Sequence, residues 1–176
     1  CRLYETKNKQ LSTNIAEYAN SQNPVKNRDI RSVDYTQKKL EQEFLAKELY
    51  YERKKNQYEG KPKKERIDAE KAGQVLLAFY NKMPAEAKNR KSIIFGDKYE
   101  EVFNEDITAD KILLPYTLWQ RIENIKIEEK PEIISNPEKF EEKSYLLYSS
   151  YYILYILNEI TGYLEMDIDI DIDSLD

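Results

Sequence analysis

Two polar stretches of this chain hold residue types that could do chemistry. The first, ANSQNPVKNRDIRS at 19–32, gathers amides, arginines and an aspartate around one proline. Arginine matches phosphate groups bidentately and Asn or Gln can pair with adenine, so this composition suits recognition of nucleic acid. The candidate binding residues in it are Asn20, Gln22, Asn23, Arg28, Arg31 and Ser32. The alternative is a polar turn whose side chains hydrogen-bond their own backbone.

The second stretch, YYERKKN at 50–56, mixes tyrosines with basic residues. Residues 26–66 hold thirteen Lys or Arg against eight Asp or Glu. Single-stranded nucleic acid is held by neutralising its backbone and stacking its bases on aromatic rings. Tyr51, Arg53 and Lys54 are therefore candidate contacts to DNA or RNA. An exposed hairpin whose charges are merely solvated would have the same composition.

A catalytic alternative rests on the E-x-K spacing of Glu52 and Lys54. In a metal-dependent nuclease the carboxylate holds Mg²⁺ and the lysine steadies the attacking water, and Asp29 or Asp34 would be the upstream acid. This spacing arises readily by chance in a chain rich in Glu and Lys. We expect Glu52 to form a structural ion pair with Arg28 or Arg31 instead. Mg²⁺ is implied only by the nuclease alternative, and otherwise no cofactor or metal site is expected.

Composition excludes several classes of site. The chain has no histidine and only Cys1 as cysteine, so a four-ligand structural zinc site and a Ser-His or Cys-His triad cannot form within it. Its four glycines lie far apart, which excludes a P-loop and a dinucleotide fingerprint. The DIDIDID run at 167–173 lacks the glycine of a calcium loop. A single cysteine and no signal peptide in view predict a cytoplasmic location.

The hydrophobic pattern predicts a mainly α-helical domain with a small β-hairpin or short sheet. A strand is expected at 2–6, and another at 49–55 that turns through EGKP at 59–62 into a hairpin with KKERI. Asp34 with Gln37 resembles a capping box, and Pro115 should kink or split its helix. Helices are expected through NIAEYA at 14–19, from Asp34, from Asp68, from Pro84 as a short turn, from Thr108, and from Pro137 to about Gly162.

The segment YLLYSSYYILYIL at 145–157 is apolar all round. A membrane span needs about 20 such residues, so we expect a long buried C-terminal helix and no membrane association. Beyond it, residues 129–176 hold twelve acidic residues against three lysines. We therefore expect one domain at 1–165 followed by an acidic tail at 166–176, which could shield the basic middle of the chain.

Two blocks, NSQNPV..RD.RS.D at 20–34 and YYERK at 50–54, are followed in order by LLAFYNKMPAEAK, IIFGDKYEEVFN and LLPYTLWQRIE. This succession, over about residues 2–127, resembles the abortive infection phage resistance (AIPR) family. The resemblance implies a role in bacterial defence against phage but no mechanism. Family members are longer, so the resemblance implies a C-terminal portion that works with an N-terminal region of the same protein. Cys1 in place of an initial Met likewise indicates a fragment.

The sequence therefore predicts an anti-phage domain that binds or senses nucleic acid. The alternatives are a metal-dependent nuclease that uses Asp29 or Asp34 with Glu52 and Lys54, and a protein-interaction module. Because the two blocks flank one amphipathic helix, we expect 20–34 to dock against 50–54 and form one polar surface.

Overall fold

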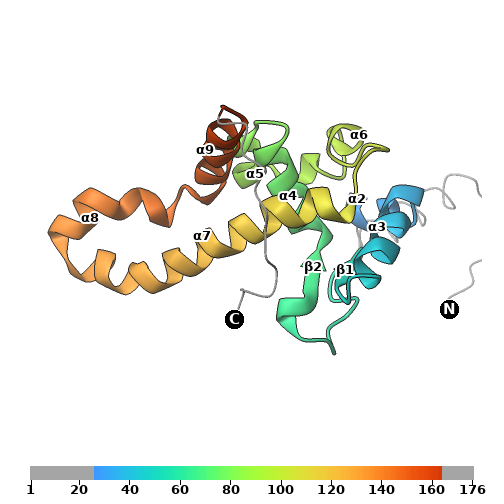
Figure 1. The fold of residues 1–176 in the computed structure, drawn as a ribbon, viewed down its shortest axis with the longest axis horizontal. Coiled ribbons are helices and arrows are strands. Elements are labelled where there is room, and N and C mark those ends of the chain that lie inside the picture. Colours follow the sequence, from blue (N-terminus) through green and yellow to red (C-terminus); the bar gives the residue numbers. More distant parts are fainter. Residues whose placement is uncertain (1–25, 164–176) are drawn as a thin grey trace, which may run out of the picture.

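A computed structural model of the chain describes residues 26–163 (Figure 1). The expected strand at 2–6, the helix through 14–19 and the acidic tail lie outside these residues, as do Asn20, Gln22 and Asn23. The described elements are α2 (Asn27–Arg31), α3 (Tyr35–Leu45), β1 (Tyr50–Glu52), the 3-10 helix η1 (Lys63–Glu65), β2 (Arg66–Asp68), α4 (Ala69–Phe79), α5 (Pro84–Asn89), η2 (Lys91–Ile93), α6 (Tyr99–Val102), α7 (Ala109–Ser135), α8 (Pro137–Lys143), η3 (Ser144–Leu147) and α9 (Ser150–Tyr163). The expectation of a mainly α-helical fold is confirmed.

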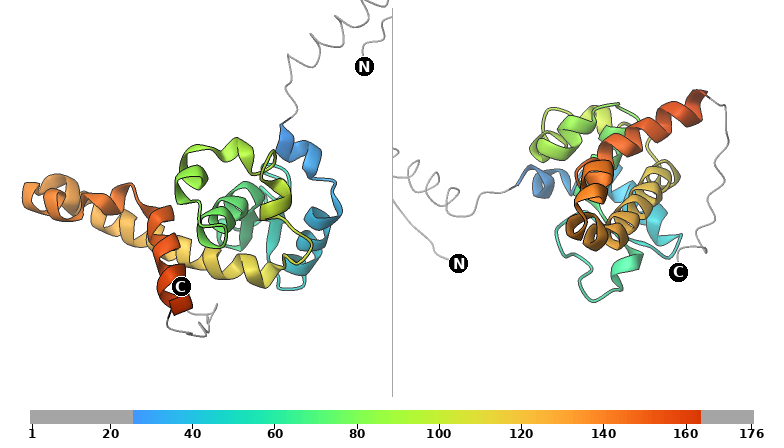
Figure 2. Two further views of the ribbon diagram at one scale, coloured as in Figure 1. Left: turned by 90° about the horizontal axis from the view of Figure 1, so that it is seen from above. Right: turned by 90° about the vertical axis from the view of Figure 1, so that its left-hand side faces the viewer.

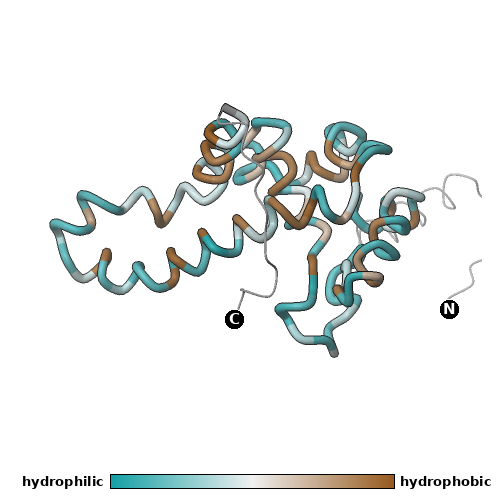
Figure 3. The backbone as a smooth tube through the Cα atoms, in the orientation of Figure 1, coloured by the Kyte–Doolittle hydropathy of each residue, from teal (hydrophilic) through white to brown (hydrophobic). Residues whose placement is uncertain are grey.

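Helix α4 is the centre of the core. All its residues from 72 to 79 are buried, and it packs against α5, α7 and α9. Figure 3 shows the hydrophobic segments of these helices turned toward one another in the body of the molecule. Gly73 allows close approach here, because a Cβ at this position would overlap Cγ2 of Ile94 and lie 3.2 Å from Cζ of Phe103. The fold is thus built around one helix that is buried on every side from residue 72 to residue 79.

The two short strands pair in parallel, so the expected hairpin is wrong and the expected short sheet is correct. Tyr50 pairs with Arg66, Tyr51 with Ile67, and Glu52 with Asp68. Parallel strands require a connection of about a dozen residues or more, which a tight EGKP turn cannot supply. Residues 53–65, which include η1, form the connection that returns the chain to the start of the sheet, where β2 begins. The register puts Tyr51 and Ile67 on the core face and the other side chains on the opposite face.

Helix α7 is the longest described element and crosses the whole body (Figures 1 and 2). Pro115 and Pro131 lie inside it without splitting it, contrary to one of the two outcomes expected for Pro115. A proline removes one backbone donor, and Pro115 is buried against the core, where packing offsets the loss. The second half of α7 and all of α8 form an arm that extends away from the body (Figure 1).

The C-terminal region differs from the single buried helix that was expected. It divides into α8, η3 and α9, and α9 buries Tyr151 and Leu154 while Tyr152 and Ile156 are 41% and 50% exposed. The break falls at Ser149, whose hydroxyl donates to the carbonyl of Tyr145, a local bond that competes with regular helix. Within residues 26–163, no helix combines the length and the apolar character that a membrane span requires.

Candidate functional site at the junction of α2, β1 and β2

Arg28 connects the first polar stretch to the second. Its side chain, in α2, is almost fully buried. Nη2 donates to the Glu52 carbonyl at 2.6 Å, and Nε donates to the Arg53 carbonyl at 3.1 Å. Nη2 also forms an ion pair of 2.7 Å with Oδ2 of Asp68. One guanidinium thus satisfies the carbonyl groups at the end of β1 and holds the end of β2 beside them.

Arg53 makes the reciprocal contacts. Its Nε donates to Oε2 of Glu41 in α3 at 2.8 Å, and its Nη1 donates to the Ser32 carbonyl. Ser32 is itself buried, and its hydroxyl donates to the carbonyl of Asp29 at 2.6 Å. The expected docking of the two blocks is therefore confirmed for residues 26–34, the described part of the first block. The contact is a network of hydrogen bonds and ion pairs that holds the ends of β1 and β2 together.

Glu52 forms its ion pair with Arg66, at 3.2 Å, so the expected partner Arg28 or Arg31 is wrong. The parallel register explains the difference, because side chains of Glu52 and Arg66 lie on the same face of the sheet. Oε1 of Glu52 also accepts from the backbone N–H of Tyr58 at 3.2 Å. Glu52 is 6% exposed, so its carboxylate braces the loop after β1 from inside.

Tyr51 lies on the core face of the sheet. It is fully buried, its ring stacks on Phe44 with 5.2 Å between centroids, and its hydroxyl donates to Oε1 of Gln37 at 2.9 Å. Burial raises the pKa of Tyr51 well above its ordinary value. Asp34 is the N-cap residue of α3, but its side chain makes no cap hydrogen bond, so the expected capping box with Gln37 is not formed. Gln37 instead accepts the hydrogen bond from Tyr51. In this arrangement the Tyr51 ring has no face on which a base could stack.

Tyr50 and Tyr58 are the tyrosines on the outer side of this region, whereas Tyr51 was the tyrosine chosen from the sequence as a binding residue. Their ring centroids are 5.3 Å apart, and Nζ of Lys61 lies 4.7 Å from the Tyr50 centroid. Both rings are partly exposed. The signal that favours Tyr50 over Tyr51 is the strand period of two, which puts the two side chains on opposite faces.

The loop between the strands carries a concentration of positive charge. Residues 53–64, the basic loop, hold six Lys or Arg and one Glu. Arg53 is tied inward, whereas Lys54, Lys55 and Lys63 are exposed and have no ion-pair partner among residues 26–163. The electrostatic potential around the loop is therefore positive and is not cancelled by its own structure.

Two of the three acids named for the nuclease alternative, Asp34 and Glu52, pair with separate arginines. Asp34 pairs with Arg31 at 3.2 Å, and Glu52 pairs with Arg66. Lys54 is exposed in the loop, beyond the end of β1. In the part of the chain that the structure describes, no group of three or more His, Cys, Asp or Glu side chains could hold a metal ion.

Arg31 also belongs to α2, but its side chain contacts a different part of the chain. Its guanidinium sits 4.3 Å from the Tyr99 ring centroid and also approaches Glu100, at 3.5 Å. It contributes to a hollow of about 330 Å³ that α2 forms with the residues before α6. The lining residues are Asn27, Ile30, Arg31, Phe95, Gly96 and Asp97. The first polar stretch thus also meets the IIFGD phrase of the family resemblance.

Comparison with protein families agrees with these blocks. The family model described as AIPR protein matches residues 1–175. The chain therefore belongs to the AIPR family, which is associated with abortive infection and phage defence. Searches of curated proteins and of solved structures found no match.

Proposed function

We propose that this domain binds nucleic acid through the basic loop, as the sensing or docking part of an anti-phage defence protein. The observation that carries the proposal is the set of exposed ammonium groups of Lys54, Lys55 and Lys63, which have no ion-pair partner in the described part of the chain. Lysines of this kind neutralise phosphates and release counterions, which is the main source of affinity for a nucleic-acid backbone. The partly exposed rings of Tyr50 and Tyr58 add surfaces for stacking.

The buried network gives the loop its shape. The loop starts where β1 ends and finishes where β2 begins, and both of its ends are fixed. The ion pairs Arg28–Asp68 and Glu52–Arg66 fix them. A loop held in this way loses less conformational freedom when it binds. Under this proposal Arg28, Ser32, Arg53 and Tyr51 position the binding surface. Asn20, Gln22 and Asn23 remain predicted contacts, and a cytoplasmic location, where phage nucleic acid is present, is part of the proposal.

The test is a gel-shift or fluorescence-anisotropy titration with single-stranded and duplex DNA and RNA, over a series of salt concentrations. Lys54→Ala with Lys55→Ala should weaken binding and reduce the slope of log K against log salt by about one to two. Arg53 is unsuitable for this test, because its removal would also break the contacts to Glu41 and Ser32.

The matched control removes two positive charges from the arm. Lys130→Ala with Lys139→Ala changes net charge by the same amount on α7 and α8, away from the loop (Figure 1). It should leave affinity and salt slope unchanged. Equal losses in both double variants would show only a non-specific charge effect and would refute the basic loop as the site.

A second candidate function is protein interaction, and the arm favours it. Ile127, Ile134 and Phe140 on α7 and α8 are 66%, 60% and 46% exposed. Apolar groups exposed together in this way are typical of interaction sites. If the wild-type chain binds none of the nucleic acids at any salt concentration, this function replaces the first. It then predicts that Ile127→Glu abolishes association with the N-terminal region of the same protein in a co-purification assay.

A further inference from the structure

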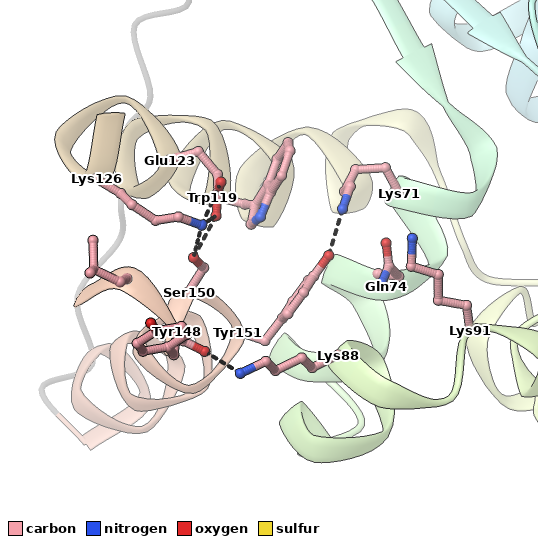
Figure 4. Close-up of a pocket in the computed structure, with 11 residues that line it drawn as sticks. Lys71, Gln74, Lys88, Lys91, Trp119, Glu123, Lys126, Tyr148, Ser150 and Tyr151 are labelled. Atoms are coloured by element: carbon pink, nitrogen blue, oxygen red, sulfur yellow. Dashed lines mark hydrogen bonds and ion pairs between the residues drawn. The ribbon is translucent and has the colours of Figure 1, made fainter. Parts of the chain in front are cut away.

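A second polar site lies in the C-terminal half of the domain, away from the basic loop. It is a cavity of about 260 Å³ among α4, α5, α7 and the start of α9, called here the lysine cavity (Figure 4). Four lysines line it, together with Gln74, Trp119, Glu123, Tyr148 and Tyr151. They are Lys71, Lys88, Lys91 and Lys126, contributed by four separate segments of the chain.

The charges in this cavity are unbalanced. Lys126 pairs with Glu123 at 2.9 Å, and Lys91 pairs with Glu70 at 3.4 Å. Lys71 and Lys88 have no carboxylate within ion-pair distance among residues 26–163. Lys71 donates to the Tyr151 hydroxyl at 2.6 Å, and Lys88 donates to the Tyr148 carbonyl at 2.6 Å. Two cations therefore face the cavity with only neutral partners, which favours an anion.

Lys71 is also held in a desolvated position. Burial and then the nearby Lys91 ammonium together lower the pKa of Lys71 to about 8, against the opposing charges of Glu123, Asp68 and Glu70. Its Nζ lies 4.5 Å from the Trp119 ring centroid. A bound anion would supply the charge partner that this ammonium group lacks.

Gln74 supplies an independent indication of a ligand. Its side chain is 1% exposed, and Nε2 donates to the carbonyl of Ala87 at 2.6 Å. This bond fixes the orientation of the amide, because a flipped amide would place two oxygens against each other. Among residues 26–163, Oε1 of Gln74 then has no hydrogen-bond donor, and the Gln74 side chain lines the cavity between Tyr151 and Lys91 (Figure 4). A buried acceptor without a donor costs free energy, which a ligand N–H or O–H would recover.

These features together define the ligand chemistry. Lys71 and Lys88, which have no carboxylate within ion-pair distance among residues 26–163, favour an anion, and Gln74 favours a donor that a fully ionised phosphate lacks. Lys71 covers one face of the Trp119 ring, and the other face offers a surface for a flat group. The volume lies near the lower limit of about 300 Å³ for small-molecule pockets, so it excludes a dinucleotide or a polymer. We propose that the lysine cavity binds a nucleoside monophosphate. Lys71 and Lys88 hold the phosphate, Trp119 stacks on the base, and Gln74 accepts from the nucleoside.

The proposal does not depend on nucleic-acid binding by the basic loop. Isothermal titration of the full chain with AMP, GMP, CMP and UMP should give binding of at least one of them, with a matching rise in the melting temperature. The corresponding nucleoside and inorganic phosphate should each bind about tenfold or more weakly. If none of the four nucleotides binds at millimolar concentration, the site is refuted. If inorganic phosphate binds as tightly as the nucleotide does, the assignment to nucleotides is refuted.

Variants locate the binding. Lys71→Met and Lys88→Ala should each weaken nucleotide affinity about tenfold or more, because each removes a charged hydrogen bond to phosphate. Lys88 is exposed, so its removal leaves the core intact even if Lys71→Met folds poorly. The control Lys98→Ala removes a partly exposed lysine that pairs with Glu101, and it should bind as wild type does. Undiminished affinity in both cavity variants overturns the assignment.

Discussion

Arg28 and Asp68 form an ion pair of 2.7 Å that joins three elements at one carboxylate. Asp68 is the last residue of β2 and the N-cap of α4, where Oδ1 accepts from the backbone N–H of Lys71 at 2.9 Å. Oδ2 of the same carboxylate forms the ion pair with Arg28 of α2. The polar motif therefore fixes the start of the central helix, and with it the first residue of the lysine cavity.

Replacing Arg28 should destabilise the domain strongly. Arg28→Ala removes three charge-assisted contacts and leaves two carbonyls and one carboxylate without their donor, at a cost of about 3 kcal/mol. Urea unfolding followed by circular dichroism measures this free energy. Arg28→Lys should recover only a part, because an ammonium cannot reproduce the planar fork.

Asp68→Asn provides the matched comparison for Arg28→Ala. Asn caps a helix as well as Asp does, so this variant loses the ion pair and keeps the cap. It should therefore cost less than Arg28→Ala. A loss of less than about 1 kcal/mol in Arg28→Ala would show that the network does not stabilise the fold.

The parts of the fold that sequence could predict are those decided locally. Helices were expected from Asp68, Thr108 and Pro137, and each of them is present. Their caps are Asp68, Thr108 and Asn136, and each cap side chain accepts from a backbone N–H of the first turn. A cap needs only the residue and its own helix. The direction of β2 was not predictable in this way, because it depends on the path of the whole loop and on Arg28, which contacts both strand ends.

The same distinction applies to the sites. The two polar blocks could be recognised because each is continuous in sequence, but their contacts were not. Glu52 faces Arg66 only because of the parallel register. Tyr51 points into the core, where its ring stacks on Phe44 and its hydroxyl donates to Gln37. The lysine cavity has no continuous motif at all. Lys71, Lys88, Trp119 and Tyr151 belong to separate helices, so only the packing of α4 brings them together.

Gly73→Ala should destabilise the core, although alanine normally favours a helix over glycine by about 1 kcal/mol. The added methyl group would overlap Ile94 and crowd Phe103, both fully or almost fully buried. Overpacking of this kind costs about 1–3 kcal/mol, so a net loss of up to about 2 kcal/mol is expected in urea unfolding. The control is Gly162→Ala, where no atom lies within 4 Å of the new Cβ in α9, and it should be neutral or slightly stabilising. A stabilised Gly73→Ala would contradict the tight contact between α4 and Ile94.

The buried ammonium of Lys71 should make stability rise with pH. The pKa of Lys71 is lowered from its ordinary 10.5 to about 8 in the folded state, mainly by burial. Below about pH 8 both the folded and the unfolded chain carry the charge, and the folded state bears its desolvation cost. Between about pH 8 and 10 the folded state releases this proton while the unfolded state retains it, so the free energy of unfolding increases with pH.

Unfolding of wild type and Lys71→Met between about pH 7 and 9.5 measures this effect. The range stops there because burial raises the pKa of Tyr116 to about 12, and that of Tyr99 to about 12, so unfolded tyrosines that ionise above about pH 10 would reverse the trend. The stability of Lys71→Met relative to wild type should be greatest at pH 7 and should shrink as pH rises. Lys82→Met is the control. Glu159 raises the pKa of Lys82 above 10.5 in the folded state, so Lys82 stays protonated in both the folded and the unfolded state over this pH range. A difference between wild type and Lys71→Met that is constant from pH 7 to 9.5 would mean that Lys71 keeps an ordinary pKa, and the lysine cavity would lose one of its supports.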